Sequence, residues 1–260
     1  MNLTLTNKNA LVCGASAGIG RASAHALATL GARVTVAARN EDKLKAVVAE
    51  LPNQELNHEY LVADFSDPSQ LKAAIMEAAS KQAFHILINN TGGPKGGPIY
   101  SADISEFTNA FKQHLVCNQL LVQAVAPGMK ANNYGRIINI ISTSVKQPID
   151  GLGVSNTIRG AVASWSKTMA NELGQFGITV NNVLPGFTAT DRLADIVANA
   201  AKKLDKTQEE AAQFMRQLVP AKRFAQPEEI ANAVAFLASP AASYINGINL
   251  PVDGGRTKSL

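Results

Sequence analysis

Short, continuous runs of apolar and β-branched residues alternate along the chain with longer segments of helical periodicity. The runs read NALVC, RVTVAA, YLVA, HILIN, RIINII and ITVNNVL, at residues 9–13, 33–38, 60–63, 85–89, 136–141 and 178–184. Because the runs are continuous rather than alternating, they predict strands that are covered on both faces. The repeated strand–helix order predicts a parallel sheet with right-handed crossovers and helices on both sides. No Pro/Gly/Ser-rich linker interrupts the pattern, so we expect one doubly wound α/β domain over residues 1–260.

The helical segments carry signals for their ends. In GRASAHALATLGA, Gly31 is placed to end the first helix, and in NEDKLKAVVAEL, Asn40 is placed to cap the second, with acidic residues in its first turn.

Residues 191–220 depart from the strand–helix alternation and predict one or two helices with no strand. Their apolar stripe comprises Leu193, Ile196, Val197, Ala200, Phe214, Met215 and Leu218. Two interpretations stay open for this segment: a mobile lid over a ligand site, or a structural or subunit-packing helix.

A glycine turn follows the first predicted strand. The stretch LVCGASAGIG places Gly14, Gly18 and Gly20 between that strand and the first helix, together with Ser16 and Ile19. Glycines there allow a tight turn and a close approach of the backbone to a pyrophosphate, while the helix N-terminus offers free N–H groups to the negative charge. The context therefore predicts a dinucleotide site, although the spacing differs from GxGxxG.

The end of the second predicted strand indicates which dinucleotide is bound. A carboxylate there would bind a ribose 2′-hydroxyl and repel a 2′-phosphate, whereas an arginine would do the reverse. This chain has Ala38 and Arg39. We therefore expect Arg39 to bind the phosphate with help from Ser16, which favours NADP(H) over NAD.

Composition excludes several other classes of protein. A hydrophobic fraction of 46% with 17% charged residues is typical of a compact globular chain. The net charge of +4 is dispersed, so we expect an anionic small ligand rather than nucleic acid. No apolar run approaches membrane-spanning length and the first residues lack a signal-peptide pattern, so we expect a cytoplasmic protein without membrane contact or metal site. The two cysteines, Cys13 and Cys117, lie in apolar segments and are expected to be reduced and inert.

Several further motifs extend the glycine turn into the pattern of a known family. They are VADFSD, INNTGG, NNVLPGFTAT, RFAQPEEIANAVAFLAS and YINGINLPVDGG. With them the chain resembles the classical short-chain dehydrogenases/reductases over nearly its whole length, and within that family the bacterial 3-oxoacyl-carrier-protein reductase type. The resemblance implies a seven-stranded parallel sheet and a homo-oligomer, either a tetramer or a dimer. It also carries the cofactor contacts onto Asp64, Phe65, Asn90, Gly92, Pro185, Gly186, Thr188 and Thr190, with Thr91 in place of the family's alanine.

The resemblance fails in the residues that move the proton. In the family, a tyrosine donates the proton, a lysine lowers the pKa of that tyrosine and binds the nicotinamide ribose, a serine polarises the carbonyl, and an asparagine holds a relay water. Ser142 matches the serine, but Ser155 stands at the tyrosine position, Arg159 at the lysine position and His114 at the asparagine position. A shifted alignment does not recover the motif, because no tyrosine of the chain is followed four positions later by lysine.

A serine hydroxyl is a far weaker acid than phenol, and Arg159 does not titrate near neutral pH, although it can still bond ribose hydroxyls. Two replacements for the lost acid are open: His114 donates the proton directly or through water, or Arg159 and Ser142 stabilise a developing alkoxide as fixed donors. The alternatives are a hydrogen-bonded helix histidine without chemistry, and a Ser155 that only fills the space of the ring.

The loop TGGPKGGP, residues 91–98, follows the fourth predicted strand, and its Lys95 either meets an anionic substrate or is simply solvated. Two functions remain for the whole chain. The first is an NADP(H)-dependent oxidoreductase for a ketone or secondary alcohol with a rebuilt acid/base site. The second is a catalytically silent NADP(H) sensor or partner subunit, which the missing tyrosine and lysine favour.

Overall fold

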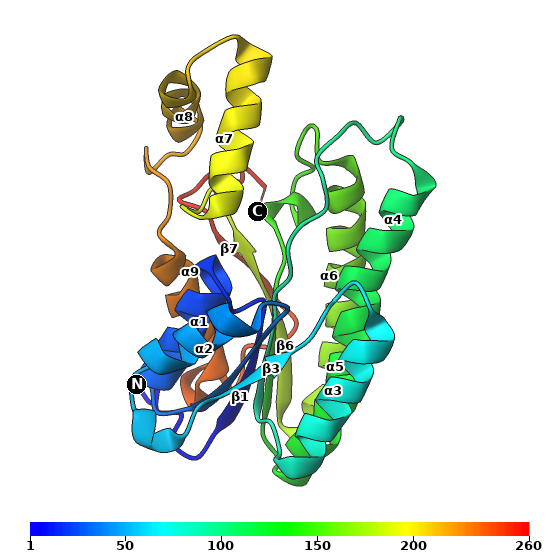
Figure 1. Ribbon diagram of the computed structural model, residues 1–260, viewed down its shortest axis with the longest axis vertical. Coiled ribbons are helices and arrows are strands. Elements are labelled where there is room, and N and C mark those ends of the chain that lie inside the picture. The colour runs from blue at the N-terminus through cyan, green and yellow to red at the C-terminus, as the bar shows by residue number, and fades with distance from the viewer. Residues whose placement is uncertain (260) are drawn as a thin grey trace.

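Seven parallel strands form one sheet in the order β3-β2-β1-β4-β5-β6-β7 (Figure 1). The computed structural model describes residues 1–259. The strands are β1 (Asn9–Cys13), β2 (Arg33–Ala38), β3 (Glu59–Val62), β4 (Ile86–Asn89), β5 (Gly135–Ile140), β6 (Ile178–Pro185) and β7 (Asn249–Val252). Each of the six apolar runs coincides with a strand, so the predicted doubly wound α/β fold is confirmed. The strand order reverses between β1 and β4, which is where such sheets bind ligands.

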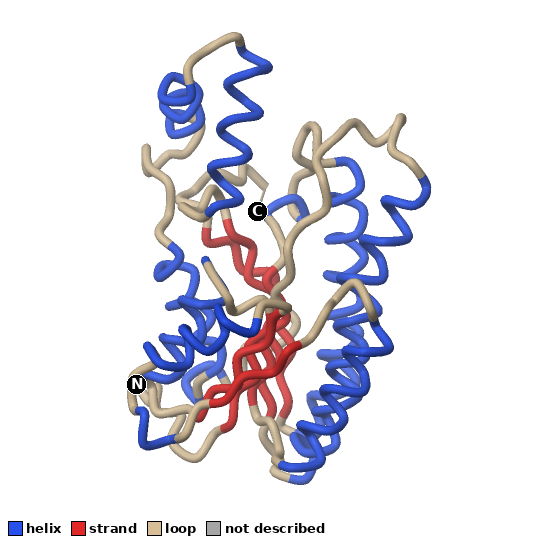
Figure 2. The backbone as a smooth tube through the Cα atoms, in the orientation of Figure 1, coloured by secondary structure: helices blue, strands red, loops and turns tan. Residues whose placement is uncertain are grey.

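Helices cover both faces of the sheet (Figure 2). One face carries α1 (Gly18–Thr29), α2 (Glu41–Glu50) and α9 (Pro227–Ala238), and the other carries α3 (Pro68–Lys81), α4 (Ile104–Phe111), α5 (Cys117–Ala131) and α6 (Gly153–Leu173). A separate apolar core fills each side, one of them built around Leu27, Val36 and Ile88 and the other around Leu87, Leu121 and Ile137.

The expected helix ends are present. The Asn40 side chain accepts a hydrogen bond from the Lys43 N–H at 2.9 Å and so caps α2. Gly31 follows the last residues of α1 with a φ of +92°, a left-handed conformation that other residues avoid.

A row of asparagines links the four strands β4, β5, β6 and β7 across the sheet. The Asn89 amide donates to Asn139 at 2.8 Å, Asn139 donates to Asn182 at 2.9 Å, and Asn182 donates to Asn249 at 2.8 Å. Ser166 on α6 also joins Asn139 and Asn182. Buried polar groups require such partners, so the row fixes the register of β4 to β7 next to the loops that carry the candidate site.

The segment predicted to lack strands forms two helices, α7 (Asp191–Leu204) and α8 (Gln208–Gln217). They stand beyond the carboxyl end of the sheet (Figure 1) and bury Leu193, Val197 and Met215 between them. Two residues of the apolar stripe, Phe214 and Leu218, are 51% and 49% exposed. Their side chains lie outside the α8 face that packs on α7, which is formed by smaller residues and Met215.

Within residues 1–259, none of the helices combines the length and apolar character that crossing a bilayer requires.

Candidate active site

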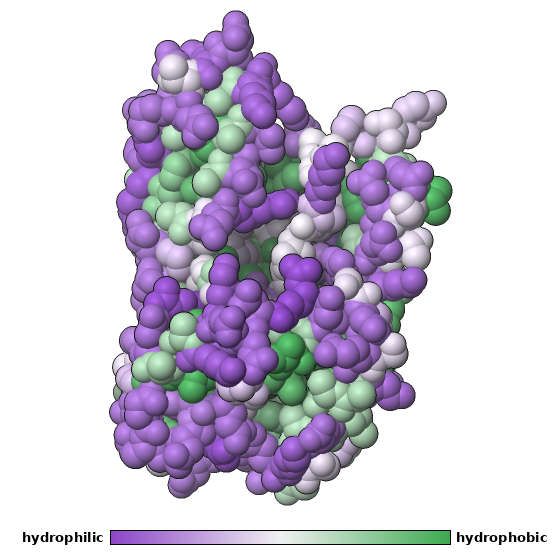
Figure 3. Space-filling model, in the orientation of Figure 1, coloured by the Kyte–Doolittle hydropathy of each residue, from purple (hydrophilic) through white to green (hydrophobic). Residues whose placement is uncertain are grey.

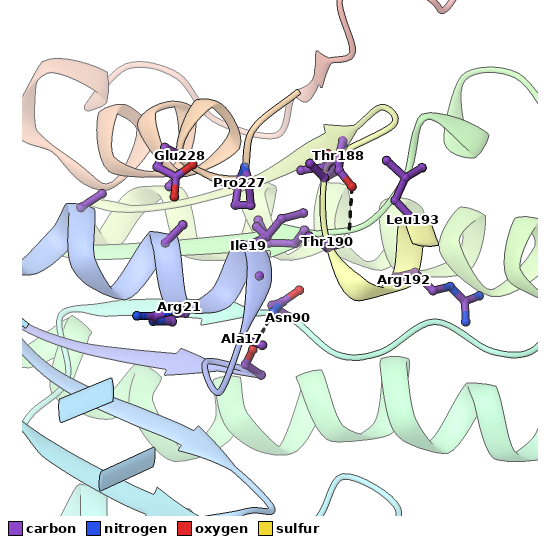
Figure 4. A pocket seen from close by; sticks show the side chains of 18 of the residues that line it. Ala17, Ile19, Arg21, Asn90, Thr188, Thr190, Arg192, Leu193, Pro227 and Glu228 are labelled. Carbon is purple, nitrogen blue, oxygen red and sulfur yellow. Dashed lines mark hydrogen bonds between the residues drawn. The ribbon is translucent and has the colours of Figure 1, made fainter. Parts of the chain in front are cut away.

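A large open cavity lies at the carboxyl ends of the central strands. Its volume is about 1390 Å³, and it extends from this crevice to the outer sides of α1 and α9. The loops that follow β1, β4, β5 and β6 all contribute to its lining. Figure 3 shows a hollow with apolar residues in its depth on a largely hydrophilic face. In Figure 4, Ile19 at the start of α1 faces Thr188 and Thr190 on the segment that leads into α7.

The glycine turn is packed directly against the loop after β4. A Cβ on Gly14, which has a φ of +60°, would lie 2.5 Å from the Asn90 carbonyl oxygen, and one on Gly20 would lie 2.2 Å from the Gly14 carbonyl oxygen. The Asn90 amide donates to the carbonyls of Cys13 and Gly14 at 3.3 and 3.2 Å. The turn therefore requires glycine at both positions, and Asn90 holds it in place.

The N-terminus of α1 is open toward the cavity. Ala17, at its N-cap, offers no side-chain cap, so the first N–H groups of the helix remain available to a ligand. A Cβ on Gly92, across the crevice, would meet nothing within 4 Å. Free N–H groups at a helix N-terminus with an open backbone opposite fit a dinucleotide pyrophosphate.

Arg39 and Asp64 are neighbours at the ends of β2 and β3. Hydrogen bonds from Ser66 hold the pKa of the Asp64 carboxyl below its usual value, and the positive charge of Arg39 adds to this effect. Arg39 itself is exposed, so its guanidinium can reach a phosphate from solvent.

Ser142, Ser155 and Arg159 share the other end of the cavity. The Ser142 Oγ accepts a hydrogen bond from the Ser144 N–H at 3.1 Å. Arg159 is only 7% exposed, and its Nη1 donates to the Ile140 carbonyl at 3.1 Å. Burial, followed by the nearby charge of Arg192, lowers the pKa of Arg159 to about 10. The guanidinium therefore still carries its charge at neutral pH.

His114 lies behind this end of the cavity rather than in its lining. It belongs to a π-helical segment, Lys112–Val116, a distortion that is common at functional sites. Its Nδ1 is 2.6 Å from the Thr91 Oγ1, and Thr91 does line the cavity. The His114 Nε2 is buried without a hydrogen-bond partner among the described residues. Burial, followed by the charge of Arg159, lowers the pKa of His114 to about 2, so the imidazole is neutral at physiological pH.

This neutral histidine predicts a pH-dependent stability. Unfolded His114 takes up a proton below about pH 6.5, whereas the folded side chain does not until about pH 2. The unfolded state therefore binds more protons in this window, and the free energy of unfolding falls as the pH falls, by at most about 1.4 kcal/mol per pH unit. Urea unfolding of the wild type and His114→Gln between pH 7 and pH 5 measures this contribution. In His114→Gln the free energy of unfolding is expected to depend less steeply on pH than in the wild type. His25→Gln, on the exposed face of α1, is the control and should keep the slope of the wild type. Equal slopes for the wild type and His114→Gln would contradict the contribution of His114.

The structure brings most of the site residues predicted from the sequence into one lining, and leaves five outside it. Those that line the cavity are Gly14, Ser16, Gly18, Ile19, Asn90, Gly92, Ser142, Ser155, Arg159, Pro185, Gly186, Thr188 and Thr190. Those that do not are Gly20, Arg39, Asp64, Phe65 and His114. Lys95 lies outside the lining as well, on the exposed part of its loop.

Two residues of the cavity were not predicted as functional. Thr91 was noted only as a replacement for alanine, although its hydroxyl connects the cavity to His114. Arg192, in the first turn of α7, lines the cavity and donates from Nη2 to the Pro94 carbonyl at 2.8 Å. Its place directly after the loop that carries Thr188 and Thr190 is the signal that could have identified it.

Comparison with known proteins gives matches over nearly the whole chain. Residues 14–257 match a family described as enoyl-(acyl carrier protein) reductase. The chain is 33% identical over 260 residues to the NADPH-dependent reductase BacG of Bacillus subtilis (strain 168), covering 98% of this chain and 100% of that protein. It is 33% identical over 255 residues to the 3-oxoacyl-[acyl-carrier-protein] reductase FabG of Rickettsia bellii (strain RML369-C), covering 97% and 98%. The crystal structure of L-sorbose reductase from Gluconobacter frateurii, complexed with NADPH and L-sorbose, superposes with a TM-score of 0.92 at 29% identity and covers both chains fully, 100% of each.

Proposed function

The chain belongs to the short-chain dehydrogenase/reductase family, and we propose that it is an NADP(H)-dependent oxidoreductase of the 3-oxoacyl-reductase type that acts on a ketone or secondary alcohol. One observation carries this proposal. A single cavity at the reversal of strand order is lined at one end by the glycine turn and at the other by Ser142, Ser155 and Arg159. We expect the active form to be a homo-oligomer, a tetramer or a dimer, in the cytoplasm.

The cofactor end of the cavity suits NADPH, which supplies the hydride when bound. In our proposal the first N–H groups of α1 hold the pyrophosphate, and Arg39 with Ser16 binds the 2′-phosphate, because a guanidinium forms charge-assisted bonds with phosphate oxygens. Thr188 and Thr190 border the nicotinamide. Two of the similar proteins support NADPH as the cofactor: BacG is described as NADPH-dependent, and the L-sorbose reductase structure contains NADPH.

At the substrate end, the proposed acid/base site works without a tyrosine. The Ser142 hydroxyl donates a hydrogen bond to the carbonyl oxygen, and the Arg159 guanidinium stabilises the negative charge that develops there. The Thr91 hydroxyl, held at 2.6 Å by His114, lies on the cavity surface and is placed to pass a proton. Because His114 is neutral, its role in this proposal is to orient the Thr91 hydroxyl through their hydrogen bond. The Thr91 hydroxyl gives its proton to the developing alkoxide and takes one back from solvent in the open cavity.

Arg39 provides the test of cofactor preference. Arg39→Ala removes the charge opposite the 2′-phosphate, so the Kd for NADPH is expected to rise about 10- to 100-fold, while the Kd for NADH stays within about threefold. Fluorescence titration of both cofactors measures this. Arg33→Ala, at the other end of β2, is the matched control. An equal loss of affinity for both cofactors would contradict the role of Arg39.

A second candidate function is a catalytically silent NADP(H) sensor or partner subunit. The observation that favours it is that, within residues 1–259, none of the four tyrosines lines the cavity. NADPH oxidation with a panel of small ketones, aldehydes and acyl thioesters separates the two functions. Turnover that falls in Ser142→Ala supports the reductase, whereas tight NADPH binding without turnover of any compound supports the silent module.

A further inference from the structure

Two arginines from different helices converge at the substrate end of the cavity. Arg159 lies on α6 and Arg192 in the first turn of α7, and both line the cavity. Their Nη2 atoms are 3.8 and 3.6 Å from the position that a Cβ on Gly93 would occupy. Both guanidiniums therefore lie close to one point beside Gly93.

No carboxylate of the described residues neutralises this pair. Among residues 1–259, neither Arg159 nor Arg192 has an ion pair within 4.0 Å. Asp191 precedes Arg192 and also lines the cavity, but it forms no such contact with either arginine. Each guanidinium donates only to a backbone carbonyl, Arg159 to Ile140 and Arg192 to Pro94, which leaves several N–H groups of each without a protein acceptor.

Two adjacent positive charges at a partly buried site repel each other unless an anion lies between them. Arg159 experiences this repulsion, because the charge of Arg192 contributes, after burial, to its lowered pKa. The planar fork of a guanidinium matches a carboxylate and binds it through two parallel hydrogen bonds.

We propose that Arg159 and Arg192 bind a carboxylate of the substrate, so that the substrate is a small oxo acid or hydroxy acid. The proposal rests on the proposed function of the cavity. Its geometric basis is that Arg159 shares this end with Ser142 and Ser155, which places the carboxylate next to the carbonyl that would be reduced. The cofactor's pyrophosphate is the other anion that could approach Arg192, and the experiment distinguishes the two sources.

The test is calorimetric titration with oxamate, a non-reducible analogue of a 2-oxo acid, and with its neutral ethyl ester, on the NADP⁺ complex and on cofactor-free protein. The wild type is expected to bind oxamate at least about 10-fold more tightly than the ester, since charge-assisted bonds to carboxylate are lost in the ester. Arg192→Met is the main variant, because Arg192 is exposed and its loss should not disturb folding. Arg159→Lys keeps the buried charge and removes the fork. Lys202→Met, near the other end of α7, is the matched control, and Lys95→Met tests the neighbouring loop.

The expected result is an oxamate affinity that falls about 10- to 100-fold in Arg192→Met, less in Arg159→Lys, and not in Lys202→Met or Lys95→Met, with NADPH affinity near that of the wild type. Three results would overturn the proposal. The wild type could bind oxamate and its ester equally, or oxamate binding could be lost in Lys95→Met alone. In the third result, oxamate competes with NADPH, and Arg192→Met binds NADPH more weakly. The last result would assign the arginines to the cofactor phosphates. Because none of these readouts needs turnover, failure of the carboxylate site is distinguishable from failure of the reductase function.

Discussion

Gly20→Ala is expected to abolish measurable NADPH binding, with an affinity at least about 100-fold below that of the wild type. The added methyl group would lie 2.2 Å from the Gly14 carbonyl oxygen and 2.8 Å from the Asn90 amide nitrogen. Neither neighbour can move freely, because Asn90 is hydrogen-bonded to both Cys13 and Gly14. Relief of the clash therefore requires the turn itself to change shape, which displaces the N–H groups that would face the pyrophosphate.

The same substitution is expected to lower the free energy of unfolding by about 1–3 kcal/mol, the usual cost of overpacking. Gly160→Ala on α6 is the control, since a Cβ there would meet nothing within 4 Å. Alanine in a helix interior is more favourable than glycine by about 1 kcal/mol, so this variant should be as stable as the wild type or more so, with unchanged NADPH affinity. Thermal unfolding and fluorescence titration of both variants provide the measurements. A Gly20→Ala protein that binds NADPH like the wild type would contradict the assignment of the turn.

Arg159→Met is expected to lower kcat by about 10²- to 10³-fold, the usual effect of removing one preorganised donor at a developing oxyanion. Arg159 is the buried cation of the substrate end, and its guanidinium is held by the Ile140 carbonyl in a fixed orientation. A fixed charge of this kind needs no reorganisation during the reaction, so its loss should lower kcat. Because Arg159 also contacts the proposed substrate carboxylate, KM should rise as well. The Kd for NADPH is expected to rise by at most about 10-fold, from lost contacts to the ribose.

Arg159→Lys is expected to retain more of kcat than the methionine variant, because it keeps the charge. Steady-state kinetics with separate kcat and KM values test both variants, and a thermal unfolding curve shows that each is folded. If Arg159→Met turns over substrate as fast as the wild type does, Arg159 has no part in the chemistry.

Local sequence patterns predicted the fold, and they predicted the glycine turn that borders the cavity. Strands buried on both faces must be continuously apolar, so each one is visible as an apolar run in the sequence. A turn that packs the start of a helix against a neighbouring loop needs glycine, so it is visible as a cluster of glycines. Gly14 and Gly18 have the positive φ angles that this reasoning requires, and Asn40 caps α2 as its position predicts.

The substrate end depends on contacts between distant segments, which local patterns do not encode. Thr91 and His114 are 23 residues apart, and their hydrogen bond joins the loop after β4 to the π-helical segment Lys112–Val116. Arg192 reaches Pro94 across 98 residues. Conversely, Phe214 in α8 and Leu218 directly after it belong to the apolar stripe but are half exposed, because the period alone does not tell which face meets α7.

The central claim is that this chain transfers hydride from NADPH although none of the tyrosines among residues 1–259 lines the cavity. The most direct test of this claim is isotope transfer. NADPH deuterated at the reactive carbon of the nicotinamide would be incubated with the wild type and a panel of small ketones, aldehydes and 3-oxoacyl thioesters, and the products analysed by mass spectrometry. The expected result is one deuterium in the alcohol formed from at least one compound, with the yield reduced in Arg159→Met. Tight NADPH binding with no deuterium in any product would contradict it and support the silent NADP(H)-binding module.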